Sequence, residues 1–282
     1  MSENKPNFIF IGPGRTGTSM IYEALLLHPD VCLAKNIRIT NYFCTEFYKG
    51  EEWYLSFFSE CQRDNVIGEM GSNYFYDILS AKRIFDLLPK VKLISILRNP
   101  YERLISSYNY KLRASLIAPE VSINEAIYSY PDLVLDNMYF DNLSGFYDKF
   151  QDENIRVLIY DDLKEDPVEF MAELYKYIGA STDFSPSIVK ENINPSSLLR
   201  FDFIGSYLRN FIEWMRSNEY YSILDLLQRN IFLRSLLFKE VPAPAISSVL
   251  TESSIKYLAS LYEPQIIKIE NLVGRDLSSW RM

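Results

Sequence analysis

The sequence predicts an α/β fold, with a P-loop-like parallel β-sheet flanked by helices and a helical C-terminal portion. Two observations support this fold class. Short apolar runs alternate with amphipathic helical patterns up to about residue 195, and the first apolar run passes through a glycine-containing turn into a helical pattern. With 282 residues, 48% of them hydrophobic, the chain can bury a large core. We therefore expect one domain over residues 1–282, with an α/β core (1–195) followed by a mainly helical lid and C-terminal helix (196–282).

The strands of the core are predicted from short apolar runs bounded by turn residues. Runs of this kind are typical of strands buried on both faces, as in a parallel sheet. Four such runs occur, "NFIFI" (7–11), "NVIGEM" (65–70), "VKLISILR" (91–98) and "IRVLIY" (155–160).

The helices of the core are predicted between these runs, where apolar residues recur at helical spacing and proline or glycine marks the ends. Beyond about Ser196 the alternation with strands stops. A mostly helical pattern is expected there from 198 to 238, then a loop, then a last helix before Gly274. The expected core helices are 18–29, 76–89, 101–113 and 166–179.

Composition restricts the class of protein. The formal net charge of −8 disfavours nucleic acid, anionic lipid and polyanionic sugars as partners, and no apolar run approaches the ~18 residues of a membrane span. The polar start "MSENKPN" does not resemble a signal peptide. We therefore expect a soluble, cytoplasmic protein without a membrane or nucleic-acid partner and of uncertain oligomeric state.

Cysteine and histidine usage gives two further expectations. The three cysteines form no CxxC pair, and an odd number without a secretory signal predicts reduced, packed thiols rather than disulfides. His28 is the one histidine of the chain, so no metal site is expected.

The turn after the first strand has the sequence "GPGRTGTS". Gly12 and Gly17 have the spacing of a Walker loop, GxxxxGK[ST], but Thr18 stands where that loop has its lysine, which disfavours Mg-ATP chemistry. The turn can still hold an anion, because unpaired N–H groups and the helix dipole both favour negative charge at a helix N-terminus. Ser19 adds a hydroxyl and Arg15 adds a cationic fork. An ordinary strand-to-helix turn would have the same glycines, and the loop by itself does not decide between the two.

A second basic element follows the third predicted strand. In "LISILRNPYERLISSYNY", Arg98 ends the strand and Ser106 lies eight residues later in the next helix. In parallel sheets, ligands bind at the carboxyl ends of the strands. Two small basic sites in an acidic protein therefore predict a compact anionic ligand.

Together, GxxRxGT[ST] after a strand and a later "LRNPxxRxxSxY" resemble the two-part signature of sulfotransferases that use 3′-phosphoadenosine 5′-phosphosulfate (PAPS). "LIYDDLKEDP" and "NLVGRDLSSW" resemble further segments of that family, so the resemblance spans Phe8 to Trp280. It implies a PAPS cofactor, adenosine 3′,5′-bisphosphate (PAP) as product, and no metal. The implied cofactor-binding residues are Gly14, Arg15, Thr16, Gly17, Thr18 and Ser19 for the phosphosulfate, Arg98 and Ser106 for the 3′-phosphate, Tyr160 near the nucleotide, and Ser196 and Arg200 in a loop over it.

The resemblance also implies catalytic groups. Arg15 is expected to neutralise charge on the leaving phosphate, electrostatically rather than as a general acid. The family's usual base, a glutamate after the first helix, corresponds to Ile39, so this base is absent. Glu69 is the candidate carboxylate that remains, although a role in holding Arg15 or a loop is favoured over catalysis; Glu46 is expected to be a solvated charge and His28 a capping and packing residue. Either the acceptor is a reactive nucleophile that needs little help, or a distant acid acts as the base.

The predicted function is transfer of a sulfuryl group to a hydroxyl or nitrogen of a small-molecule acceptor, a neutral or cationic natural product of secondary metabolism. Five aromatic residues are expected to wall its pocket, Tyr42, Phe43, Trp53, Tyr74 and Tyr76. Two alternatives stay open: a P-loop small-molecule kinase, and a non-catalytic nucleotide-binding sulfotransferase homologue.

Overall fold

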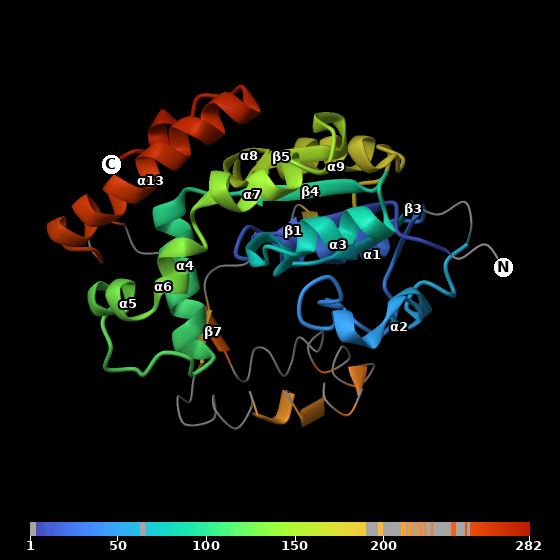
Figure 1. Ribbon diagram of the computed structural model, residues 1–282, viewed down its shortest axis with the longest axis horizontal. Coiled ribbons are helices and arrows are strands. Elements are labelled where there is room, and N and C mark those ends of the chain that lie inside the picture. The colour runs from blue at the N-terminus through green and yellow to red at the C-terminus, as the bar shows by residue number, and fades with distance from the viewer. Residues whose placement is uncertain are drawn as a thin grey trace. The chain divides into compact units, whose positions relative to one another are not determined.

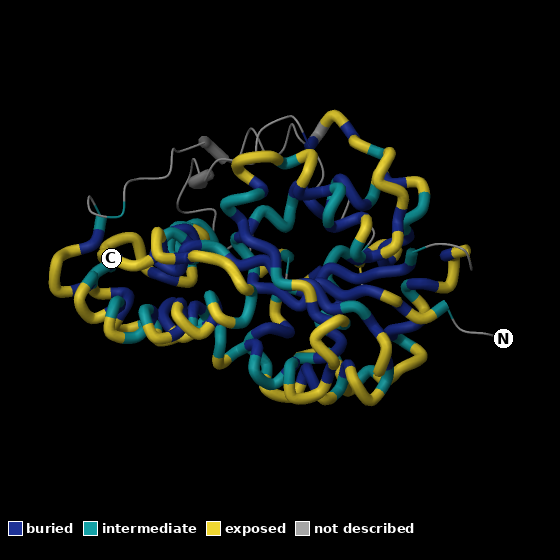
Figure 2. The backbone as a smooth tube through the Cα atoms, turned by 90° about the horizontal axis from the view of Figure 1, so that it is seen from above, coloured by how far each residue is buried: buried dark blue, intermediate teal, exposed yellow. Residues whose placement is uncertain are grey.

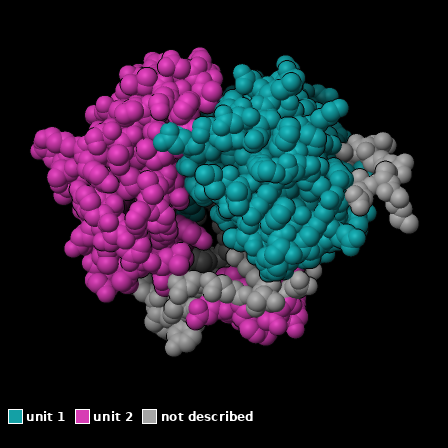
Figure 3. Space-filling view, in the orientation of Figure 1, with its two compact units in different colours: residues 1–98, 141–194 teal, residues 99–140, 195–282 magenta. Residues whose placement is uncertain are grey.

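The computed structural model describes residues 4–62, 66–189 and 249–282, together with short stretches between 197 and 246 (Figure 1). The chain groups into two compact units (Figure 3). The first comprises residues 1–98 and 141–194, and the second comprises residues 99–140 and 195–282. The prediction of a single domain divided near residue 195 stays a prediction.

A five-stranded parallel sheet forms the centre of the first unit, which confirms the predicted fold class. The strand order is β2-β3-β1-β4-β5, so β1 lies in the middle. The sequence predicted four of these strands and missed β2, which has three residues and too short an apolar run to stand out. The strands are β1 (Phe8–Gly12), β2 (Val31–Leu33), β3 (Val66–Met70), β4 (Lys92–Leu97) and β5 (Ile155–Ile159).

Helices flank this sheet (Figure 1). The sequence sets their ends locally: the Asp166 side chain accepts hydrogen bonds from the first turn of α9, and Gly179 ends that helix with φ 92°. Tyr160 begins a helix rather than ending the preceding strand. The helices are α1 (Thr18–Leu27), α2 (Glu51–Ser56), α3 (Ser80–Leu87), α8 (Tyr160–Glu165) and α9 (Pro167–Ile178), with short 3₁₀ turns η1 (Phe47–Lys49), η2 (Tyr74–Tyr76), η3 (Asp152–Asn154) and η4 (Ser187–Val189).

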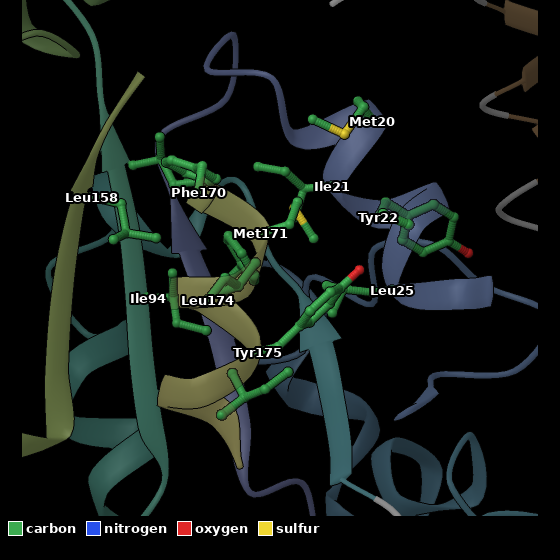
Figure 4. Close-up of a cluster of buried hydrophobic side chains, with 14 of the residues drawn as sticks. Met20, Ile21, Tyr22, Leu25, Ile94, Leu158, Phe170, Met171, Leu174 and Tyr175 are labelled. Carbon is green, nitrogen blue, oxygen red and sulfur yellow. The ribbon is translucent and has the colours of Figure 1, made fainter. Parts of the chain in front are cut away.

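One hydrophobic cluster joins α1 and α9 to one face of the sheet (Figure 4). Phe8 and Phe10 of β1 contribute to it, and their alternation with Ile9 and Ile11 buries both faces of the strand. The strands form the most deeply buried part of the unit (Figure 2). This rigid centre holds the carboxyl ends of the strands in place.

The second unit is mainly helical. The Asn99 side chain caps α4 by accepting from the N–H groups of Tyr101 at 3.0 Å and Glu102 at 3.4 Å, with Pro100 in the first turn. Its elements are α4 (Pro100–Arg113), α5 (Ile123–Ser129), α6 (Pro131–Leu135), α13 (Glu252–Val273), η7 (Ser278–Trp280) and the antiparallel pair β6 (Ser197–Leu199) and β7 (Phe238–Glu240). Helix α7 (Tyr139–Tyr147) begins in this unit and ends in the first.

One secondary-structure prediction needs correction, and three helices were missed. Helix was expected from 198 to 238, but the two ends of that range pair as β6 and β7, because a contact between residues about forty positions apart overrides the local helical pattern. Helices α5, α6 and α7 were not predicted. Within the described residues, no helix combines the length and apolarity needed to cross a membrane.

The expectation of three reduced thiols is wrong for two of them. Cys32 and Cys61 form a disulfide with Cα atoms 5.8 Å apart, and Cys44 is free. The two residues are 29 positions apart in the chain, with Cys32 on β2 and Cys61 after α2. No local motif marks the pair, because tertiary packing brings its members together.

Candidate active site

The glycine-containing turn connects β1 at the centre of the sheet to α1. Its backbone takes left-handed φ values at Gly12 (117°), Arg15 (72°) and Gly17 (79°). The buried Thr16 hydroxyl donates to the carbonyl of Pro13 at 2.9 Å and closes the turn on itself. Gly17 is the N-cap of α1 and offers no side chain to its first turn. The first N–H groups of α1 are therefore available to an anion.

The predicted phosphosulfate residues lie together in this loop. Gly14, Arg15, Gly17, Thr18 and Ser19 are partly exposed, so their N–H groups, hydroxyls and guanidinium can reach a ligand. A helix N-terminus with an arginine and two hydroxyls suits a phosphosulfate group without the lysine that contacts the β- and γ-phosphates in a Walker loop. The residues present therefore fit the donor that the sequence implies.

Tyr160 and Arg98 lie beside this loop on the β4–β5 side. The guanidinium carbon of Arg98 is 4.8 Å from the centre of the Tyr160 ring. A Cβ atom placed on Gly17 would lie 3.1 Å from Cε2 of Tyr160 and 2.5 Å from Cδ2 of Leu163. The Ser95 hydroxyl of β4 also donates to the carbonyl of Gly12 at 2.9 Å. Three predicted groups, the loop, Arg98 and Tyr160, thus meet at one edge of the sheet.

The other predicted donor contacts are not placed at this edge. Ser106 lies in α4 of the second unit and is 6% exposed. Ser196 and Arg200 lie outside the described residues. The roles of all three stay predictions.

Glu69 is fully buried on β3 and is held by hydroxyl groups. Its Oε1 accepts from Tyr74 at 2.5 Å and from Thr40, and its Oε2 accepts from Tyr54 at 2.7 Å. Burial raises the pKa of the Glu69 carboxyl, while these hydrogen bonds act in the opposite direction. A carboxylate with no exposed surface and three hydroxyl donors is arranged to hold neighbouring segments.

The aromatic residues expected to wall an acceptor pocket are largely core. Tyr42, Phe43 and Tyr74 are 3%, 0% and 0% exposed, so the prediction is wrong for these three. Tyr42 stacks on Tyr54 with ring centres 4.5 Å apart, because a run of aromatic residues after β2 packs on itself. Trp53 is partly exposed, with the Lys49 ammonium 4.5 Å from its ring centre.

Two other sequence candidates have structural contacts. His28 is 2% exposed, with Nε2 at 2.9 Å from the carbonyl of Ser181 and Nδ1 accepting from the Asp30 N–H at 3.1 Å, which confirms its capping and packing role. Glu46 is partly exposed and pairs with Lys49 at 3.5 Å.

Sequence reasoning missed two of the residues that hold Glu69 and the residue of the turn after β3 that contacts the loop. Nothing in the spacing of Thr40 and Tyr54 along the chain connects them to Glu69. Ser72 was missed for the same reason, although a Cβ atom placed on Gly12 would lie only 2.6 Å from the Ser72 carbonyl oxygen. These contacts join segments far apart in the chain.

Comparison with known proteins decides the family. The model of the sulfotransferase domain family matches residues 5–200. The chain belongs to the sulfotransferase family. The predicted recognition and the expectation of a transferase rather than a kinase are thereby confirmed at the level of the family.

Curated relatives resemble the sulfotransferase domain over part of their length. The bifunctional heparan sulfate N-deacetylase/N-sulfotransferase 4 of Mus musculus is 27% identical over 204 residues, covering 66% of this chain and 23% of that protein. The corresponding enzyme 1 of Mus musculus is 28% identical over 199 residues, covering 63% and 22%. The chain thus spans under a quarter of the length of these two relatives.

Solved structures show the same fold. A sulfotransferase from Alicyclobacillus acidocaldarius superposes with a TM-score of 0.68 at 19% identity, covering 99% of both chains. Mouse sulfotransferase SULT7A1 complexed with PAP gives a TM-score of 0.55 at 14% identity, covering 95% of this chain and 86% of that one. Retinol dehydratase in a complex with retinol and PAP gives 0.51 at 15% identity, covering 93% and 82%.

Proposed function

We propose that this protein transfers a sulfuryl group from PAPS to a hydroxyl or nitrogen of a small-molecule acceptor and releases PAP. The observation that carries the proposal is the meeting of the anion loop, Tyr160 and Arg98 at one edge of the sheet. Family membership supports it, as do neighbours of the same fold solved with PAP.

The donor residues divide by the part of the donor that they hold. The N–H groups of residues 14–19, the hydroxyls of Thr18 and Ser19 and the Arg15 guanidinium bind the phosphosulfate. The family resemblance assigns Arg98 and Ser106 to the 3′-phosphate, Tyr160 to the nucleotide, and Ser196 and Arg200 to further contacts with it. Arg15 stabilises the charge that develops on the leaving phosphate as the bond from sulfur to its bridging oxygen breaks and the bond from the acceptor to sulfur forms. An arginine performs this role as a fixed cation.

The acceptor atom must lose a proton during transfer, and the family's usual base position is Ile39. Glu69 is a poor substitute because it is fully buried and bonded to three hydroxyls. An amine nitrogen needs little help from a base, and relatives at 27–28% identity are named N-sulfotransferases. We therefore favour nitrogen as the sulfated atom, and its proton passes to solvent or to an acid distant in sequence.

The acceptor is proposed to be small, a natural product that is neutral or cationic. The heparan sulfate named in the relatives is a long polyanion, which a chain of net charge −8 would repel unless an extended basic surface offset that charge. The structural neighbour with retinol supports a small acceptor in this fold.

The test is calorimetric titration with PAP in metal-free buffer. We expect tight binding to the wild type, weakened about 10- to 100-fold by Arg98→Ala and by Arg15→Ala, because each loses charge-assisted hydrogen bonds worth about 1.5–3 kcal/mol. Arg156→Ala is the matched control, since Arg156 is exposed at the amino end of β5 and pairs with Glu173. Its affinity should equal that of the wild type.

Two results would change the conclusion. Absence of PAP binding, or binding that requires magnesium and prefers ATP, would overturn the donor site. Tight PAP binding with no turnover across a broad acceptor panel would support a non-catalytic nucleotide-binding homologue instead.

A further inference from the structure

Two asparagines meet at the β3 side of the anion loop. Asn41 lies in the segment after β2 and Asn73 lies in the turn after β3, and Nδ2 of Asn73 donates to Oδ1 of Asn41 at 3.0 Å. Asn73 is exposed and Asn41 is partly exposed. Asn41 has a left-handed φ of 53°, which turns the chain at this point. The pair therefore forms an amide surface open to solvent at the carboxyl ends of two strands.

This surface adjoins the loop. The turn after β3 begins with a hydrogen bond from the Gly71 N–H to the carbonyl of Phe10 at 2.8 Å. A Cβ atom placed on Gly12 would lie 2.6 Å from the Ser72 carbonyl oxygen, and one placed on Gly14 would lie 3.7 Å from Ser72 Cβ. Ser72 directly precedes Asn73. The amide pair is thus one residue away from a segment packed on the loop.

Strand order separates the two sides of the loop. Arg98 and Tyr160 follow β4 and β5, whereas Asn41 and Asn73 follow β2 and β3, on the other side of the central strand β1. If the nucleotide lies on the β4–β5 side, the β2–β3 side is left for the acceptor, because the reacting sulfur is held between them by the loop.

Glu69 holds the residue next to each asparagine. Its Oε1 accepts from Tyr74, which follows Asn73, and from Thr40, which precedes Asn41. The Thr40 and Tyr74 hydroxyls also lie 3.0 Å apart. All three of these side chains are buried, with exposures of 0–1%. A rigid buried cluster that positions two exposed polar side chains is the arrangement expected of a recognition site.

The two carboxamides have more hydrogen-bond donors and acceptors than their mutual hydrogen bond uses. A carboxamide offers two N–H donors and one carbonyl oxygen. The Asn41 oxygen accepts from Asn73 and weakly from the Cys44 thiol at 3.9 Å, while the Asn41 amide N–H groups and the Asn73 oxygen have no partner among the residues that the structure describes. These groups present donors and an acceptor side by side, without charge.

We propose that Asn41 and Asn73 bind the acceptor, and that this acceptor is a neutral polar molecule with a hydroxyl or amino group beside the sulfated atom, as in a sugar or an amino sugar. The inference rests on the proposed function and narrows its acceptor. A flat phenol would need apolar walls. Three of the five aromatic residues expected to form them, Tyr42, Phe43 and Tyr74, are buried in the core, and the other two are only partly exposed. The Glu69 carboxylate next to the pair has no exposed surface and cannot pair with a cationic acceptor.

The experiment measures initial rates with PAPS and two classes of probe acceptor, the sugars glucosamine and glucose and the phenol 4-nitrophenol. We expect turnover of a sugar probe and none of the phenol. Asn41→Ala and Asn73→Ala should each lower kcat/KM for the sugar about three- to tenfold, the effect of one lost uncharged hydrogen bond. The affinity for PAP should stay within twofold of the wild type.

Control variants distinguish recognition from general damage. Asn154→Ala alters a partly exposed asparagine beside β5 and should change neither rate nor affinity. Tyr74→Phe removes a bond to Oε1 next to Asn73, whereas Tyr54→Phe removes the bond to Oε2. Both should lower the unfolding temperature, but Tyr74→Phe should raise KM for the sugar more.

The proposal is overturned if PAP binds and the phenol alone is turned over, if neither class is turned over, or if both asparagine variants keep wild-type kcat/KM. It is also overturned if Tyr54→Phe and Tyr74→Phe change KM equally. Failure of the proposed function would be seen separately, as absence of PAP binding to the wild type.

Discussion

Single residues with left-handed backbone shape the anion loop. Gly12, Arg15 and Gly17 have φ values of 117°, 72° and 79°, and each redirects the chain between β1 and α1. Only glycine adopts such values without cost, so Arg15 is held there by the surrounding loop. Gly17 is required for a second reason, because its neighbours Tyr160 and Leu163 leave no room for a side chain.

Gly17→Ala tests this double constraint. We expect it to lower the free energy of unfolding by about 2–3 kcal/mol, since it adds backbone strain and a steric clash with Leu163. Gly274→Ala is the control, because Gly274 has the same left-handed backbone conformation (φ 65°, ψ 32°) but nothing lies within 4 Å of its new Cβ, so only the strain of about 1 kcal/mol should remain. Urea denaturation measures both. If the two variants lost the same free energy of unfolding, Tyr160 and Leu163 would not be packed on the loop.

At the scale of elements, α4 is anchored by a buried polar network. Arg103 is 2% exposed and donates to the carbonyl of Asp136 at 3.2 Å and to Oδ1 of Asn137 at 2.7 Å, just after α6. Asn137 also donates to the carbonyl of Leu133 at 2.8 Å. Ser106 lies one turn after Arg103 on α4, so this network helps to fix the helix that carries the proposed 3′-phosphate contact.

Asp136 makes this network sensitive to pH. Burial raises the pKa of its carboxyl from 3.8 to about 6, although Arg103 acts to lower it. Because the folded-state pKa is the higher one, the folded state favours the protonated acid, and stability falls as pH rises from about 4 to about 6.

Asp136→Asn should remove this penalty. The full pKa shift of Asp136 would correspond to a loss of about 3 kcal/mol in the free energy of unfolding. Because Asp136 is partly exposed, we expect a loss of about 1 kcal/mol. We expect urea denaturation to show that Asp136→Asn raises the free energy of unfolding by this amount at pH 7.5 and by much less at pH 4.5. Asp86→Asn is the control, because Asp86 is exposed on α3 and pairs with Lys82. A loss of stability at pH 7.5 would mean that the ionised Asp136 pairs favourably with Arg103.

At the scale of the whole molecule, the disulfide between Cys32 and Cys61 bears on the compartment in which the protein works. The Cys32–Cys61 bond closes a long segment that contains Thr40, Asn41 and Tyr54. Disulfides persist in oxidising compartments and are rare in the cytosol. The expectation of a cytoplasmic protein stays a prediction, and the disulfide weighs against it.

Removing this disulfide should destabilise the first unit. For a loop of 29 positions, the chain-entropy model predicts a loss of about 3–4 kcal/mol. We expect Cys32→Ser, or treatment with dithiothreitol, to lower the urea midpoint of unfolding. Cys44→Ser is the control because Cys44 is free. An unchanged midpoint under reduction, with free thiols counted at three before treatment, would show that the pair is reduced in solution.

The sequence by itself determined the strand–helix alternation, the anion loop and the second basic element, because each is written in consecutive residues. Hydrophobic runs predict strands wherever they are buried on both faces, and the missing Walker lysine together with Arg98 and Ser106 indicated the family. Each of these patterns lies within a short stretch of the chain, so it can be recognised without knowledge of the fold.

Only the tertiary structure decided what depends on contact between distant residues. It placed Tyr160 against Gly17, surrounded Glu69 with three hydroxyls, joined Cys32 to Cys61, and buried Tyr42 and its neighbours in the core. It also paired β6 with β7 where the local pattern favoured helix. Packing brings these residues together across tens of positions, and no spacing rule along a single chain encodes such pairings.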